Sequence, residues 1–144
     1  MDTKRFATGT IVGGVVLFAA GWLIFSKLFA AFYAANGGSA TGVYRTDQIV
    51  WAVAVGNLAY AALVTLVIHW RGSSVTIGKG AATGAIVGFL IWCTVDFIFY
   101  GSSNIANLTR TIVDPLLEIV HGGIGGAAIA AVLRGGATTT PSQT

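Results

Sequence analysis

Four long, uninterrupted apolar runs constrain the fold of this chain more than any other feature. They cover residues 6–30, 49–70, 78–100 and 112–133. Each run is long enough to cross the hydrocarbon core of a bilayer as an α-helix, which takes about 20 residues. Because apolar residues are continuous rather than alternating, the runs exclude spanning β-strands. The sequence therefore predicts an all-α, polytopic membrane protein with four transmembrane helices in a compact bundle.

The overall composition supports a membrane protein. The chain is 55% hydrophobic and only 9% charged, whereas about 25% of the residues in soluble domains are charged. Residues 1–134 are predicted to form a single transmembrane domain, and the polar tail 135–144 is predicted to be disordered because it has no apolar pattern. The net charge of +3 comes from a few basic residues near the ends of the runs, so the predicted partner is a lipid bilayer and not nucleic acid.

The basic residues also predict an orientation. Five lie on the side of the runs that carries both termini, and three lie on the opposite side: Lys4, Arg5, Arg71, Lys79 and Arg134 against Lys27, Arg45 and Arg110. Loops rich in Lys and Arg stay in the cytoplasm. The sequence thus predicts a multi-pass protein of the inner (plasma) membrane with its N- and C-termini inside.

Glycines recur every four residues within the runs, a pattern typical of close helix–helix contact in membranes. The predicted packing positions are Gly9, Gly13, Gly80, Gly84, Gly88, Gly122 and Gly126. Such faces also serve association between chains. We therefore expect a homo-oligomer or membership of a larger membrane complex.

Polar residues inside the runs are the candidates for function. At about 1.5 Å per helical residue, five of them fall in the outer half of the bundle: Lys27, Asn57, Asp96, Glu118 and His121. Ionisable groups in a span are costly, so they usually face the bundle interior, a partner or water. These five are predicted to bind a small cation, a proton or a polar ligand, in a pocket lined by Trp22, Trp92 and Tyr100.

Each candidate also has a purely structural interpretation. Lys27 either pairs with Asp96 or Glu118 or extends towards the outer headgroups. Asn57 is expected to form an interhelical hydrogen bond if it has no functional role. Asp96 lies one turn inside Tyr100 and is interpreted as a functional or network-forming residue.

The last run carries Asp114, Glu118 and His121 at spacings of four and three, which places them on one helical face. Thr111 and Asp114 have the spacing of a capping box, and Pro115 suits a first helical turn, so Asp114 is predicted to cap the helix. Glu118 and His121 then remain as candidates for chemistry. A hydrogen bond from His121 to Glu118 is the preferred interpretation, and a metal held by Asp96, Glu118 and His121 is the alternative.

Two short stretches carry a family resemblance. They are Gly21-Trp22-Leu-Ile-Phe-Ser-Lys27-Leu-Phe29, and Asp96-Phe-Ile-Phe-Tyr100 followed by Asn104. In these two stretches the chain resembles small bacterial four-helix membrane proteins of the domain-of-unknown-function type. The resemblance implies the four-helix fold over most of the chain up to Arg134, and it implies no activity or cofactor.

The sequence contains no recognisable catalytic signature, such as a triad around a serine or cysteine or a glycine-rich phosphate loop. We therefore expect a small, non-enzymatic membrane protein that acts as a binding, accessory or assembly subunit, with its polar cluster in the outer half. A proton- or cation-coupled carrier that uses Asp96, Glu118 and His121 is the alternative. A metal-dependent membrane enzyme is a further alternative, and the sequence assigns no cofactor.

Overall fold

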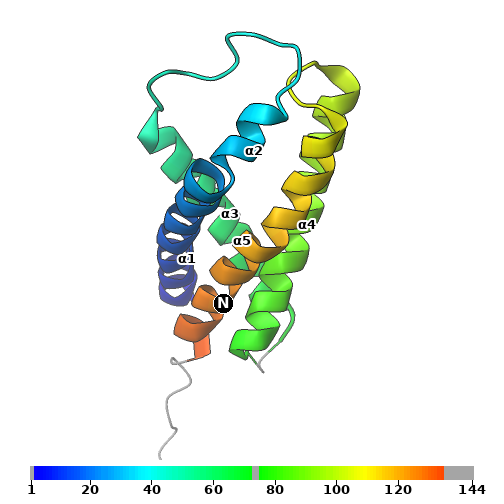
Figure 1. Cartoon of the computed structure of the whole chain (residues 1–144). Coiled ribbons are helices and arrows are strands. Elements are labelled where there is room, and N and C mark those ends of the chain that lie inside the picture. Colours follow the sequence, from blue (N-terminus) through cyan, green and yellow to red (C-terminus); the bar gives the residue numbers. More distant parts are fainter. Residues whose placement is uncertain (1, 73–74, 135–144) are drawn as a thin grey trace, which may run out of the picture.

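A computed structural model describes residues 2–72 and 75–134, which form a bundle of helices (Figure 1). The predicted disordered tail at 135–144 lies outside the described residues. In chain order the elements are α1 (Thr3–Leu23), the π-helical segment η1 (Ile24–Leu28), α2 (Ala30–Ala35), α3 (Val50–Trp70), α4 (Ile77–Ser102) and α5 (Leu108–Arg134). Four helical stretches, Thr3–Leu28, α3, α4 and α5, are long and apolar enough to cross a membrane. The predicted all-helical class with four candidate spans is confirmed.

The two ends of the bundle differ in what they carry. Both termini of the described bundle lie at one end, called here the termini end, with the connection from α3 to α4 (Figure 1). The opposite end, the loop end, carries the long connection 36–49 and the short turn before α5. There the Gly38 N–H donates to the Ile105 carbonyl at 2.9 Å, and the Ala40 N–H donates to the Asn104 carbonyl at 3.0 Å. These bonds tie the long loop to the α4–α5 turn.

The first helix is interrupted, which the sequence did not indicate. The run 6–30 was predicted to form one transmembrane helix, but α1 gives way to the wider turn of η1 and then to α2. The Phe29 N–H donates to the Ile24 carbonyl, five residues back, at 2.9 Å. This wider ring is the hydrogen-bond pattern of a π-helix. The bend turns α2 towards α5 (Figure 1).

The last helix starts one turn earlier than predicted, so the predicted cap at Asp114 is wrong. Helix α5 begins at Leu108, and the Asn107 side-chain oxygen accepts a hydrogen bond from the Arg110 N–H at 2.9 Å. Asparagine is a favoured capping residue, and here it begins the helix ahead of the Thr111–Asp114 pair. Asp114 and Pro115 consequently lie inside the helix, and both are buried.

Helix α5 is the central helix of the bundle: it contacts α1, α3 and α4, and it is the most buried of the four long helices. Its buried residues recur every three or four positions: Thr111, Asp114, Pro115, Glu118, His121, Gly122, Gly125, Gly126, Ile129, Ala130 and Leu133. The prediction that Asp114, Glu118 and His121 share one face is therefore confirmed. The face is polar towards the loop end and apolar towards the termini end.

An apolar core fills the half of the bundle nearest the termini. It joins α1, α3 and α5 through Leu17, Ala61, Val64, Ile68, Ile129 and Leu133. Close packing of these side chains stabilises this half. The polar residues of α5 lie beyond this core, towards the loop end.

Helices α4 and α5 lie side by side along most of their length (Figure 1). A Cβ atom at Gly84 would lie 2.9 Å from the Gly126 Cα and closer still to the Gly122 carbonyl oxygen. At Gly80 a Cβ would meet the Gly126 carbonyl, and at Gly88 it would lie 2.9 Å from the Glu118 carbonyl. Contacts this short leave no room for a side chain at these positions.

Candidate functional site

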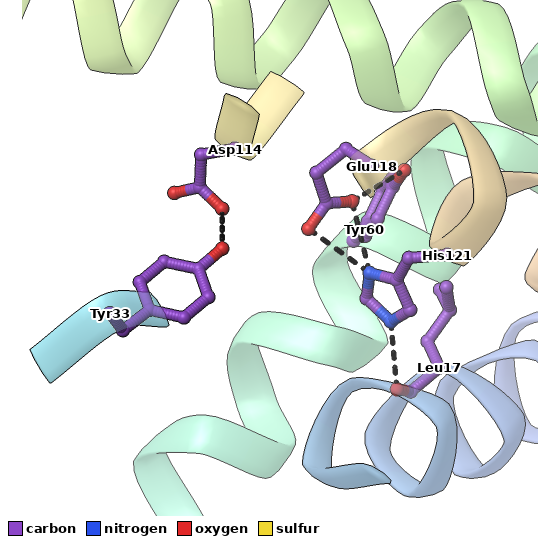
Figure 2. A network of polar contacts seen from close by, with 6 residues as sticks. All are labelled: Leu17, Tyr33, Tyr60, Asp114, Glu118 and His121. Atoms are coloured by element: carbon purple, nitrogen blue, oxygen red, sulfur yellow. Dashed lines mark hydrogen bonds and ion pairs between the residues drawn. The ribbon is translucent and has the colours of Figure 1, made fainter. Parts of the chain in front are cut away.

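A hydrogen-bonded histidine links the central helix to α1. The His121 Nδ1 lies 2.9 Å from Glu118 Oε2 and 3.1 Å from Oε1. On the opposite side of the ring, Nε2 lies 2.9 Å from the carbonyl oxygen of Leu17 (Figure 2). His121 and Glu118 are 4% and 1% exposed, so both side chains depend on these internal partners.

The Leu17 contact fixes where the protons must be. A carbonyl oxygen only accepts hydrogen bonds, so Nε2 must carry a proton and donate it to Leu17. The contact between Nδ1 and Glu118 then requires one further proton. That proton either makes His121 an imidazolium beside a carboxylate, or sits on Glu118 beside a neutral imidazole. In both arrangements the pair holds one shared proton and has no net charge.

Aromatic rings enclose the histidine. Phe25 in η1 contacts the His121 ring edge-on with centroids 5.4 Å apart, and Tyr60 in α3 does so at 6.0 Å. The Tyr60 hydroxyl lies 3.5 Å from Glu118 Oε2, which is the outer limit for a hydrogen bond. The pair is thus surrounded by side chains from η1 and α3.

Glycines make room for these side chains. A Cβ at Gly21 would lie 3.2 Å from His121 Nε2. At both Gly88 and Gly122, a Cβ would collide with the Tyr60 hydroxyl. The histidine and the tyrosine therefore occupy spaces left by glycines of α1, α4 and α5.

A second polar contact lies nearer the loop end. The Tyr33 hydroxyl donates a hydrogen bond to Asp114 Oδ1 (Figure 2), and the Arg110 guanidinium lies 5.0 Å from the centre of the Tyr33 ring. Burial and then the Asp114 carboxylate raise the pKa of the Tyr33 phenol above its ordinary value. Tyr33 therefore stays protonated at neutral pH and holds α2 against α5.

Asp96 is the unpaired member of the group. Its Oδ2 atom is buried without a hydrogen-bond partner among the described residues. Three charged side chains of α5 interact electrostatically with the Asp96 carboxyl: Asp114, Arg110 and Glu118. The structure thus brings Asp96 towards the acidic face of α5, but it does not join Asp96 to the Glu118–His121 pair by a hydrogen bond.

The remaining predicted binding residues do not join this network. The Lys27 Nζ lies 5.0 Å from the centre of the Trp22 ring, and the ion pair found among the described residues is that of Glu118 with His121. Of the two alternatives for Lys27, the pairing with Asp96 or Glu118 is therefore not formed. The Asn57 amide donates to the Val53 carbonyl of its own helix at 2.9 Å, so this bond is not the interhelical one that was expected.

The predicted pocket-lining aromatic residues lie towards the outside of the bundle. Trp22 and Tyr100 are 54% and 43% exposed, and Trp92 is partly buried. Phe25, Tyr33 and Tyr60 surround the network instead. A signal for the two tyrosines was present in the sequence, because a buried tyrosine hydroxyl needs a hydrogen-bond partner.

A metal site is not formed by the predicted ligands. Within residues 2–72 and 75–134, no group of three His, Cys, Asp or Glu side chains is arranged to hold an ion. His121 has both ring nitrogens engaged by protein atoms, one by Glu118 and one by Leu17. The alternative of a metal held by Asp96, Glu118 and His121 is not supported.

Fold and site together define an all-helical bundle with four apolar helices of spanning length and a buried Glu–His network. Comparison with protein-family models, with curated proteins and with solved structures gives no match. The resemblance to small bacterial four-helix membrane proteins therefore stays a prediction.

Proposed function

We propose that this protein is an integral membrane protein of the inner (plasma) membrane that crosses the bilayer four times with both termini in the cytoplasm. Its four apolar helices support the spanning state. Exposed tryptophans mark both ends of α3, since Trp51 and Trp70 are each 72% exposed. Tryptophan is enriched at both membrane–water interfaces.

The distribution of charge supports the proposed orientation. The termini end carries five basic side chains and one carboxylate: Lys4, Arg5, Arg71, Lys79 and Arg134 with Asp2. The half towards the loop end carries three basic side chains and four carboxylates: Lys27, Arg45 and Arg110 with Asp47, Asp96, Asp114 and Glu118. The basic end is the one expected to face the cytoplasm.

Within the membrane we propose a non-enzymatic role as a binding or assembly subunit. The observation that carries this proposal is that Glu118 and His121 are satisfied inside the bundle, by each other and by Leu17. A polar network whose members are all hydrogen-bonded holds helices in a defined arrangement. A substrate site would need groups left open to a ligand. In this proposal Glu118 holds the His121 ring in place, and the His121 bond to the Leu17 carbonyl then locks α5 to α1.

The proposed partners are the lipid bilayer and either a second copy of the chain or a larger membrane complex. Large apolar side chains remain exposed along α3 and α4, for example Val55 at 56% and Leu90 at 57%. Glycines of α4 with open space beside them, Gly78 and Gly101, allow another helix to approach.

A proton-coupled carrier is the second candidate, favoured by one observation. The Asp96 Oδ2 atom is buried without a partner beside the acidic face of α5. Unpaired ionisable groups in spans mark proton or ion pathways. In this candidate Asp96 would exchange a proton with the pair formed by Glu118 and His121.

Proton flux distinguishes the two candidates. The full-length protein is reconstituted into liposomes that enclose a pH-sensitive dye, and a pH jump is applied outside. We expect wild type, Asp96→Asn and Glu118→Gln to match protein-free liposomes. Flux in wild type that disappears in Asp96→Asn, with equal reconstitution of both proteins, would establish the carrier and overturn the locking role.

Cysteine labelling tests the proposed topology. Thr3→Cys at the start of α1 and Ser39→Cys in the long loop are each introduced into a Cys93→Ser background, Cys93 being the one native cysteine. In intact spheroplasts a membrane-impermeant maleimide is expected to label position 39 and to spare position 3 until the membrane is opened. Labelling of both positions in intact cells, or the reverse pattern, would contradict the proposed topology.

A further inference from the structure

Two oppositely charged side chains in the candidate spans have no ionic partner. Asp96 lies in the last two turns of α4, and Lys27 lies in η1. The ion pair found among the described residues joins Glu118 to His121, so neither Asp96 nor Lys27 belongs to it. Ionisable side chains in a span usually pair with one another, because an unpaired charge in hydrocarbon is costly. Each of the two would therefore gain from a partner of opposite charge.

The Asp96 carboxyl group is open to a donor. Its Oδ2 atom is buried without a hydrogen-bond partner. Its Oδ1 atom accepts no hydrogen bond from the described residues either, yet it is not a buried atom. Asp96 as a whole is partly exposed. The carboxyl group thus keeps both oxygens unbonded, and one of them is accessible from the side of the bundle.

Arg110 does not balance this carboxylate. Its charge interacts with both Asp96 and Asp114, so one base serves two carboxylates. The pair formed by Glu118 and His121 holds one shared proton and has no net charge, so it supplies no cation to Asp96. Among the described residues on this face, one negative charge is therefore left over.

Lys27 is the unpaired base, but it does not reach Asp96 within one chain. It is exposed on η1, and its Nζ lies 5.0 Å from the centre of the Trp22 ring. The charged groups that interact with Asp96 lie on α5 and do not include Lys27. Helix α4 packs against α5 and α3, whereas η1 contacts α1 and α2, and α1 and α4 lie on opposite sides of α5 (Figure 1). A contact between Lys27 and Asp96 therefore needs a second molecule.

We infer that Lys27 of one copy pairs with Asp96 of a second copy that is inserted in the same orientation. This inference rests on the proposed role as a membrane-spanning assembly subunit. Both residues lie towards the loop end, so two copies side by side bring them to similar depth. Exposed apolar side chains surround each of them, for example Leu28 at 66% and Ile98 at 62%. An interface there would exclude water, and attraction between charges is stronger where water is excluded.

Energy transfer between labelled copies of the full-length protein in liposomes tests the inference. Donor and acceptor dyes are attached at Ser39→Cys in the Cys93→Ser background, and the ratio of lipid to protein is varied. Wild type is expected to associate. Lys27→Gln and Asp96→Asn are each expected to raise the dissociation constant roughly tenfold or more, because close charge pairs across an interface are coupled by at least about that factor.

Charge reversal gives a sharper result. Lys27→Asp alone places two carboxylates at the contact, and Asp96→Lys alone places two lysines there, so neither variant is expected to associate with itself. Donor-labelled Lys27→Asp mixed with acceptor-labelled Asp96→Lys restores opposite charges at every contact, and association is expected to return. Unfolded variants would not regain association on mixing.

Arg45→Gln and Asp47→Asn are the matched controls, because they remove the same charges from the long loop at the same end of the bundle. Both are expected to associate as wild type does. Equal association of wild type, Lys27→Gln and Asp96→Asn would overturn the charge pair and leave the assembly role standing. No energy transfer in wild type would overturn the second copy as the partner. Failure of the proposed function is seen separately, in proton flux or in the cysteine labelling pattern.

Discussion

Replacing Gly84 by leucine is expected to separate α4 from α5 and to cost at least about 3 kcal/mol of unfolding free energy. Even a Cβ atom at Gly84 would lie 2.9 Å from the Gly126 Cα and closer to the Gly122 carbonyl oxygen. Those neighbours are backbone atoms, so the helices themselves must move apart. Because α5 also carries Glu118 and His121, a shifted α5 would disturb the buried network as well.

Gly56 provides the matched control. It lies within α3, and a Cβ there would meet nothing within 4 Å, so Gly56→Leu is expected to change stability by less than about 1 kcal/mol. Gly56→Ala is expected to be neutral or stabilising, since alanine is the better helix former, whereas Gly84→Ala is expected to destabilise.

The measurement is the unfolding free energy in mixed detergent micelles, followed by circular dichroism. Size-exclusion chromatography of the same samples reports whether the oligomer size changes. Equal stability and equal oligomer size for Gly84→Leu and Gly56→Leu would show that close glycine contact does not hold α4 to α5.

The sequence allowed the four candidate spans to be predicted because apolar runs of this length have few alternatives. It also allowed the face shared by Asp114, Glu118 and His121 to be predicted, since helical spacing depends only on the order of residues. The preferred partner of His121 was predicted correctly for the same reason, because Glu118 lies three residues away on one helix.

The bend at η1 could not be predicted from the pattern. Residues 24–28 read Ile-Phe-Ser-Lys-Leu, with no proline or glycine to mark an interruption. Contacts from elsewhere in the chain accompany the bend: Phe25 packs on His121 and Tyr33 bonds to Asp114. These are tertiary contacts between residues about 80 to 100 positions apart in the sequence, and local spacing carries no information about them.

The error at Asp114 has a different origin. The Thr111–Asp114–Pro115 stretch is a reasonable start for a helix, and so is Asn107 four residues earlier. The earlier cap prevails because Asn107 also donates to the Asn36 side chain at 3.2 Å, which fixes the turn to the long loop. Because the helix begins there, Asp114 lies within it and accepts a hydrogen bond from the Tyr33 hydroxyl.

The second large effect is expected at His121. Replacing it by leucine would leave Glu118, which is 1% exposed, without its main partner, and breaking a buried pair in this way costs about 3–5 kcal/mol. The Leu17 carbonyl would lose its bond from Nε2 as well. Stability is therefore expected to fall sharply.

Glu118→Gln is expected to be much milder, changing the unfolding free energy by about 1 kcal/mol or less. The glutamine amide can donate to His121 Nδ1 while Nε2 continues to donate to Leu17, which is one of the two proton arrangements the geometry permits. Glu118→Leu, in contrast, leaves Nδ1 without a donor. A loss in Glu118→Gln as large as in Glu118→Leu would contradict the assigned proton positions.

The most direct test of the locking role is a double-mutant cycle on Glu118 and His121. The unfolding free energies of wild type, Glu118→Leu, His121→Leu and the double variant are measured in the same mixed micelles. If Glu118 and His121 stabilise the bundle as a pair, the double variant will be more stable than the sum of the single losses predicts, by about 2 kcal/mol, because removing both partners leaves neither of them buried without the other. Additive losses, with a coupling below about 0.5 kcal/mol, would contradict it.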